Sequence, residues 1–182
     1  MRIFIRRLSE KKNIIGFLFL WVRICRKNGP FEATQYAWDK HGYDLWHGVD
    51  TSQILVESNI WSEGVTNVDK QYAVDSASDK IHRIKCAIKY VAKHLNLKKT
   101  KLFDLGCGKG KVLLLAKNYN FKNLYGIELS INLAKICAAN LKVKKVKHTL
   151  IVDSMRNVKW NNYISDEDQI LLYAYNPTSR KI

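Results

Sequence analysis

Three alternate glycines follow an apolar stretch, in the run Phe-Asp-Leu-Gly-Cys-Gly-Lys-Gly over residues 103–110. Glycine adopts positive φ angles readily and leaves no Cβ between the backbone and a bound ligand. A dinucleotide-binding turn, Gly-x-Gly-x-x-Gly, would place its third glycine at position 111, where the chain has Lys111. The spacing therefore predicts a ligand-binding turn between a strand and a helix and disfavours an NAD-dependent oxidoreductase.

Two acidic residues stand where later strands are expected to end. Glu128 closes the run Leu-Tyr-Gly-Ile-Glu, and Asp153 closes Leu-Ile-Val-Asp. A carboxylate at the end of the second strand can accept hydrogen bonds from both hydroxyls of a ribose. The alternatives are that Glu128 complements a helix dipole and that Asp153 caps a helix or turn.

A third polar group, Asn176-Pro177, follows the apolar run 169–175. Open α/β sheets place their chemistry at the carboxyl ends of their strands, which is where Asn176 would lie. A turn without a catalytic role accounts for the same two residues equally well.

Apolar runs alternate with segments of helical periodicity, which predicts an α/β fold with a doubly wound, mostly parallel sheet. Ser76 and Asp79 resemble a capping box before the first helix, and Ser130 is the expected N-cap of the last one. The expected strands are 101–105, 124–129, 148–153 and 169–175, and the expected helices are 78–95, 109–118 and 131–141.

We divide the chain into a basic apolar segment (1–28), an aromatic-rich and irregular segment (29–77) and the α/β core (78–182). The apolar run 14–22 is shorter than the roughly 20 residues needed to span a bilayer. The first segment is expected either to pack on the domain as a helix or to make peripheral contact with a membrane surface. The second is expected to wrap the mouth of the site, although packing alone would also explain its aromatic residues.

The composition is globular, with 47% hydrophobic residues in 182, and the net charge is +15. Such a charge favours nucleic acid or acidic lipid as a partner. The lysines look scattered and lack interleaved aromatic residues, so solvated surface is the favoured interpretation. Lys109 and Lys111, at a helix N-terminus, are expected to be exposed. Four widely spaced cysteines indicate a cytoplasmic protein without disulfides, and no metal site is expected.

The glycine turn, the run Gly126–Ser130 and the run ending in Asn-Pro resemble a little-characterised bacterial group of class I methyltransferases that use S-adenosyl-L-methionine (SAM). The segment His47–Thr51 is similar to one that precedes the core in that group. The resemblance implies a Rossmann-like core, SAM as methyl donor, and an unidentified acceptor, protein or nucleic acid. It implies Asn176 as the catalytic residue for an amino-group acceptor. The cofactor-binding residues that it implies are Asp104, Gly106, Cys107, Gly108, Gly110, Glu128 and Asp153.

The sheet of that family continues beyond its fourth strand, whereas this sequence stops soon after the run 169–175. We therefore expect a C-terminally truncated chain whose exposed fourth strand associates with a partner. The alternative to a methyltransferase is a non-catalytic protein, left by truncation, that binds SAM or nucleic acid.

Overall fold

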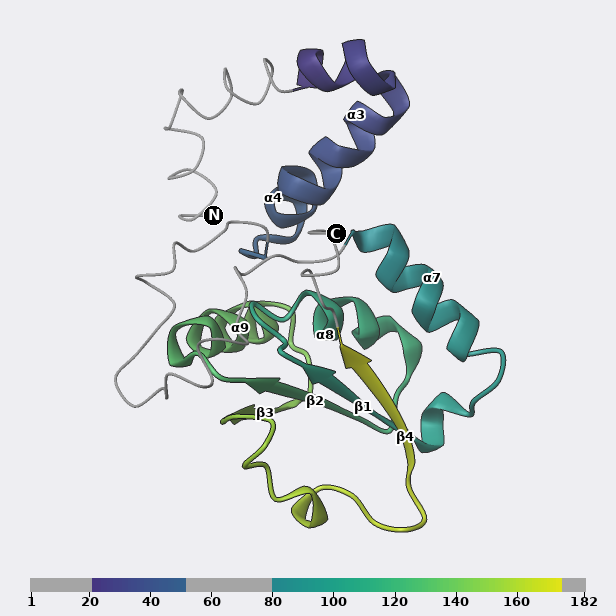
Figure 1. Cartoon of the computed structure of the whole chain (residues 1–182), viewed down its shortest axis with the longest axis vertical. Helices are drawn as coiled ribbons and strands as arrows, with labels where there is room; N and C mark the ends of the chain where they lie inside the picture. The colour runs from purple at the N-terminus through teal and green to yellow at the C-terminus, as the bar shows by residue number, and fades with distance from the viewer. Residues whose placement is uncertain (1–20, 52–79, 175–182) are drawn as a thin grey trace. The chain divides into compact units, whose positions relative to one another are not determined.

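The computed structural model of the chain describes residues 21–51 and 80–174 (Figure 1). The chain divides into two compact units, Met1–Gln53 and Ile54–Ile182, and each is described by itself. The three segments expected from the sequence remain predictions.

The first unit contains one continuous helical stretch, formed by α3 (Pro30–Ala37), a π-helical turn (Trp38–Gly42) and α4 (Tyr43–His47). The expectation of irregular structure was wrong for these residues. Pro30, at the first helical position, starts the helix because its fixed φ suits a helix and its missing N–H is not needed there. The π-helical turn adds a residue to the local repeat, which hides the usual helical spacing from the sequence.

The segment that follows α4 closes this helical stretch. Gly48 ends α4 in the left-handed conformation with φ 65°. The buried carboxylate of Asp44 accepts hydrogen bonds from the backbone N of Thr51 at 2.8 Å and from its Oγ1 at 2.6 Å. In the structure, the His47–Thr51 segment thus folds back onto the last helical turn.

The N-terminal segment 1–28 is described only from residue 21 onward, and residues 21–28 are helical. Arg23, Arg26 and Lys27 are exposed on this helix. Among the described residues, no helix combines the length and the apolar character that crossing a bilayer requires. Peripheral contact with a membrane through this segment remains a prediction.

The second unit is built on a sheet of four parallel strands in the order β3-β2-β1-β4. The predicted strands are confirmed, with small differences at their ends, and so is the Rossmann-like α/β fold class. The strands are β1 (Thr100–Leu105), β2 (Asn123–Glu128), β3 (Thr149–Val152) and β4 (Gln169–Ala174).

Among the described residues, three α-helices accompany the sheet: α7 (Ile81–Val91), α8 (Lys111–Ala116) and α9 (Ile131–Val143). α7 packs on α8, and α8 packs on α9. The Oγ of Ser130 accepts a hydrogen bond from the backbone N of Leu133 at 3.3 Å, which confirms Ser130 as the N-cap of α9.

Two predicted helices are longer than the observed ones. The helix expected over 78–95 begins at Ile81, after an extended Lys80 whose side chain does not cap it. Ser76 and Asp79, the expected capping box, lie outside the described residues. The helix expected over 109–118 begins at Lys111 because Gly110 has φ 82°, and its last part is a separate 3₁₀ turn, Lys117–Tyr119.

An aromatic cluster covers part of the sheet. Phe103 on β1 stacks on Tyr125 on β2 with 4.4 Å between ring centroids. Trp160 meets the Phe103 ring edge-on at 5.5 Å, and Tyr163 meets the Tyr125 ring at 5.8 Å. The connection from β3 to β4 therefore supplies aromatic side chains that bury the inner strands without a helix of more than one turn.

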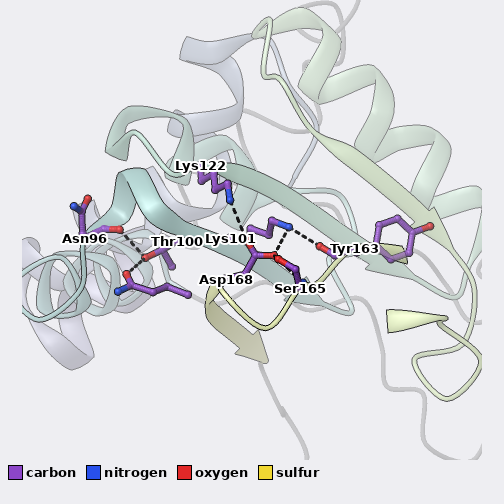
Figure 2. Close-up of polar contacts among 8 residues, drawn as sticks. Asn96, Thr100, Lys101, Lys122, Tyr163, Ser165 and Asp168 are labelled. Atoms are coloured by element: carbon purple, nitrogen blue, oxygen red, sulfur yellow. Dashed lines mark hydrogen bonds and ion pairs between the residues drawn. The ribbon is translucent and has the colours of Figure 1, made fainter. Parts of the chain in front are cut away.

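An ion-pair network fixes the start of β4 (Figure 2). Asp168 Oδ2 accepts a hydrogen bond from Lys101 Nζ of β1 at 2.6 Å, and Asp168 Oδ1 accepts one from Lys122 Nζ at 2.9 Å. The backbone N and the Oγ of Ser165 each donate to Asp168 Oδ2 at 2.8 Å. Residues at the amino ends of β1, β2 and β4 thus meet on one carboxylate.

β4 pairs with β1 among the described residues, and Leu172 on it is 55% exposed. Association of this strand with a partner remains a prediction.

We expect Asp168→Asn to weaken folding at neutral pH and to reduce the loss of stability in acid. The lysines hold the pKa of Asp168 well below its usual value. Its contribution to stability is therefore present above about pH 3.9, the unfolded pKa, and is lost as the pH falls toward the folded pKa. Denaturant unfolding across acid pH measures this effect. Asp166→Asn, at an exposed neighbour, is the matched control, and equal behaviour of the two variants would contradict the assignment.

Candidate functional site

The glycine turn joins β1 to α8 with three left-handed glycines, Gly106 (φ 75°), Gly108 (φ 51°) and Gly110 (φ 82°). The backbone N atoms of Gly106 and Cys107 both donate to the carbonyl oxygen of Ile127 at 2.9 Å. Three positive φ angles in this short span explain the glycine spacing, and the two hydrogen bonds fix the turn to the end of β2.

The three glycines differ in what surrounds them. A Cβ built on Gly106 or Gly108 would have no atom of the described residues within 4 Å, whereas one on Gly110 would lie 2.7 Å from Cys137 Sγ of α9. Gly110 therefore lets the turn pack closely on α9. Gly106 and Gly108 instead border open space in which a ligand could lie against the main chain.

Glu128, at the end of β2, joins this turn to the start of α9. Its Oε2 accepts a hydrogen bond from the backbone N of Gly108 at 2.7 Å, and its Oε1 accepts one from the backbone N of Ser130 at 2.8 Å. Burial raises the pKa of Glu128, and the backbone hydrogen bonds oppose that rise. A carboxylate has about four acceptor positions, so positions that the backbone N–H groups do not use remain for a ligand's hydroxyl groups.

Asp104, in β1, is buried beside this site. Its Oδ2 has no hydrogen-bond partner within the part of the chain that the structure describes. Burial, together with the nearby charge of Glu128, raises the pKa of Asp104 to about 8. A buried polar atom without a partner is costly, so this oxygen points to a donor that a ligand would supply.

Asp153 follows β3 and is half-buried. Its Oδ1 accepts hydrogen bonds from the backbone N of Ser154 at 2.6 Å and from Asn157 Nδ2 at 3.3 Å. Its backbone N donates to the Glu128 carbonyl oxygen at 3.2 Å. The structure thus brings Asp153 next to the end of β2, with its side chain already closing a turn, and a ligand-binding role for it remains a prediction.

Cys107 turns its side chain toward the protein interior. Its Sγ lies 4.0 Å from Cys137 Sγ, and both residues are buried. The hydrogen bond with Cys137, together with burial, raises the pKa of the Cys107 thiol. Any contact of Cys107 with a ligand would accordingly be made by its backbone. Asn176, the predicted catalytic residue, lies outside the described residues.

The expectation that Lys109 and Lys111 are exposed was wrong. They are 5% and 4% exposed, respectively. Lys111 opens α8, which packs against both α7 and α9, and every residue of this short helix is buried.

Two residues that shape the turn were not singled out from the sequence. A Cβ on Gly126, within β2, would lie 2.8 Å from Cys107 Sγ and 2.9 Å from Leu113 Cδ1, so a larger residue would push the turn away. Asn140 on α9 donates from Nδ2 to the Lys109 carbonyl oxygen at 2.9 Å. A glycine inside a strand is a known sign of close approach, and it could have identified Gly126.

The described residues include no group of His, Cys, Asp and Glu side chains arranged to hold a metal ion. At this edge of the sheet the described residues present two buried acidic side chains, Asp104 and Glu128, and exposed main chain at Gly106. Such a site suits a neutral or cationic ligand with several hydrogen-bond donors.

No family model matches the sequence, and no curated protein matches it. Several solved structures are similar to parts of the chain. One is an S-adenosylmethionine-dependent methyltransferase from Clostridium acetobutylicum, which is 21% identical over an alignment that covers 45% of this chain and 32% of that chain, with a TM-score of 0.40. TrmK of M. capricolum in complex with S-adenosyl-homocysteine (SAH) has 19% identity over 47% of this chain and 39% of that one, with a TM-score of 0.38.

Magnesium protoporphyrin IX methyltransferase from Synechocystis, with bound SAM, has 15% identity over 69% of this chain and 54% of that one, with a TM-score of 0.39. The aligned region therefore covers between 32% and 54% of the length of each of these three proteins. Two of the three are named as methyltransferases, and two were solved with SAM or SAH bound. At these identities and scores the likeness concerns the fold alone.

We expect alanine to be tolerated better at Gly106 than at Gly110. A left-handed alanine costs roughly 1–2 kcal/mol at either position. At Gly110 the Cβ would also meet Cys137 Sγ at 2.7 Å, and such overpacking adds about 1–3 kcal/mol. Denaturant unfolding should show this difference, and Cys137→Ala should reduce the cost of Gly110→Ala. An unchanged cost in the Cys137→Ala background would contradict the packing role.

Asp104→Asn should flatten the pH dependence of stability of the ligand-free protein. Because the pKa of Asp104 is about 8 when folded and about 3.9 when unfolded, the folded state binds the extra proton between these values. Stability should therefore fall as the pH rises through this range in the parent and fall less in the variant. Denaturant unfolding at about pH 5 and about pH 8 gives the comparison. Parallel curves for the two proteins would exclude Asp104 as the titrating group.

Proposed function

We propose that the second unit binds SAM at the glycine turn and that the protein acts as a methyltransferase. The observation that carries this proposal is the open main chain at Gly106 and Gly108, bordered by the buried carboxylates of Asp104 and Glu128. A ligand that combines a ribose with a cationic amino-acid portion matches both the carboxylates and the open space.

Each carboxylate has a task in this proposal. Glu128 holds the turn through its backbone hydrogen bonds and offers its remaining acceptor positions to the two ribose hydroxyls. The Oδ2 of Asp104, which has no partner among the described residues, accepts a hydrogen bond from the aminoacyl end. A cationic group near Asp104 would favour its ionised form and so offset the effect of burial.

SAM, when bound, supplies a methyl group on a sulfonium that is already an activated leaving group. The chain's own part is to align the acceptor, exclude water and receive a proton from the nucleophile. We assign the alignment of an amino-group acceptor to the carbonyl oxygen of Asn176, which follows β4. β4 lies beside β1, where the strand order reverses, and this is where open parallel sheets bind their ligands.

The test is calorimetric titration of the full chain with SAM and with SAH. We expect binding by the parent chain and a loss of roughly 10- to 100-fold in Glu128→Gln, because a hydrogen bond to a charged group contributes about 1.5–3 kcal/mol. Glu128→Ala should lose more, since it leaves the backbone N–H groups of both Gly108 and Ser130 unmatched, whereas the Gln amide oxygen can still accept from one of them.

Glu167→Gln, with the same change at an exposed residue, is the control and should bind as the parent does. Circular dichroism verifies that each variant is folded. A folded parent chain that binds neither SAM nor SAH would refute the proposal. If it binds, incubation with methyl-labelled SAM and pools of protein and nucleic acid identifies the acceptor, and binding without any transfer would leave a non-catalytic SAM-binding protein.

A further inference from the structure

The exposed side of α7 is basic and carries no acidic residue. Between residues 81 and 103 the sequence has several lysines and arginines but neither Asp nor Glu. In the structure three of these lysines, Lys85, Lys89 and Lys93, are exposed at successive turns of α7 and of the turn that continues it. We call these three residues the lysine row. The charges that look scattered in the sequence are thus gathered along one side of a helix.

The buried side of α7 sets the direction of the row. Ile81, Ile84 and Ile88 are the buried residues of the helix, and the lysines flank that apolar stripe. Residues four positions apart are neighbours on a helix surface. None of the three lysines has an ion pair or side-chain hydrogen bond within the part of the chain that the structure describes.

This arrangement has a cost that a mixed-charge surface would avoid. Like charges four residues apart destabilise a helix by roughly 0.2–0.5 kcal/mol per pair. Solvated helical faces commonly carry Glu and Lys in alternation, which gains a similar amount. That stabilisation is absent from two successive pairs of the row, Lys85–Lys89 and Lys89–Lys93. A surface that gives up this stabilisation points to an anionic partner.

An aromatic pair, formed by Tyr90 of α7 and His94 of the turn that follows it, distinguishes between anionic partners. Tyr90 is 67% exposed, and its ring centroid lies 4.9 Å from that of His94. Flat exposed rings beside cations suit the bases and phosphates of a nucleic acid. Insertion into a lipid surface would require a row of exposed aliphatic side chains, whereas the isoleucines of α7 are buried.

We propose that the lysine row binds the phosphate backbone of a single-stranded nucleic acid, with the Tyr90–His94 pair stacking on its bases. Lys85 and Lys89 are about 6 Å apart along the helix axis, from four residues at about 1.5 Å each, and Lys93 follows in the next turn of the chain. The phosphates of an extended strand can match such a spacing. The interaction depends on charge and stacking and requires no bound cofactor.

The helix that carries the lysine row is also linked to the glycine turn by packing. α7 packs on α8, which begins at that turn, and a short connection leads from α7 into β1. The helix therefore runs opposite to β1, and its first turn lies toward the carboxyl ends of the strands (Figure 1). A strand bound along α7 would extend toward that edge, which makes nucleic acid the acceptor class. This last step rests on the proposed function, whereas the binding surface does not.

The test is fluorescence anisotropy with labelled single-stranded RNA, single-stranded DNA and a duplex, using the full chain without SAM. The triple variant Lys85→Gln, Lys89→Gln, Lys93→Gln should bind single strands roughly tenfold or more weakly. Its plot of log affinity against log salt should be shallower by about 2, from three contacts at about 0.7 each. Tyr90→Ala should weaken binding to single strands more than to the duplex. Comparison of the affinities for single-stranded RNA and single-stranded DNA then shows whether ribose or deoxyribose is preferred.

The matched control replaces three other exposed lysines, Lys135, Lys142 and Lys147, with Gln and so removes the same charge. It should bind nucleic acid nearly as the parent does. Thermal unfolding should show no loss of stability in the row variant, because the change relieves repulsion between like charges. The row variant should also bind SAM as the parent does, so failure here is distinguishable from failure of the proposed function.

Three results would overturn the inference. One is no binding of any oligonucleotide by the folded parent. Another is an equal loss in the row variant and the control, which would assign binding to the net charge of +15 as a whole. The third is that the row variant loses binding to phosphatidylserine vesicles while its affinity for nucleic acid is unchanged, which would assign the row to a lipid surface.

Discussion

The buried carboxylate of Glu128 holds together the parts on which the candidate site depends. Its two oxygens accept hydrogen bonds from the backbone N atoms of Gly108 and Ser130, so one side chain fixes both the glycine turn and the start of α9. A buried charge requires such partners because its desolvation is otherwise costly. The same partners leave acceptor positions free, which lets a residue that organises the turn also receive a ligand.

Close packing beneath the turn complements this arrangement. Gly126 and Gly110 leave room for the Cys107 and Cys137 side chains, whose sulfur atoms are 4.0 Å apart. Packing of the Cys107 and Cys137 side chains thus fixes the turn on its buried side, and hydrogen bonds fix its ends. On the other side, Gly106 is exposed. A ligand would meet main chain that is already in place, which reduces the entropy cost of binding.

The two edges of the sheet have different tasks. At the amino ends of the strands, Asp168 joins Lys101 and Lys122 and fixes the return of the chain into β4 (Figure 2). Each of these groups is in an ion pair. At the carboxyl ends, Asp104 and Glu128 are buried and have raised pKa values. Ion pairs thus occupy one edge, whereas at the other Asp104 Oδ2 has no partner among the described residues, which fits the edge where parallel sheets bind ligands.

The sequence by itself determined the order of strands and helices in the core, the glycine turn and the acidic residues that end or follow strands, because these depend on local periodicity and on backbone conformations that glycine favours. Local pattern was not enough for the helical stretch 30–47, where a π-helical turn disrupts the spacing. Only the tertiary structure decided that Lys109 and Lys111 are buried and that Asp104 Oδ2 has no hydrogen-bond partner among the described residues. Those properties depend on which segments meet in space, and no short stretch of sequence contains that information.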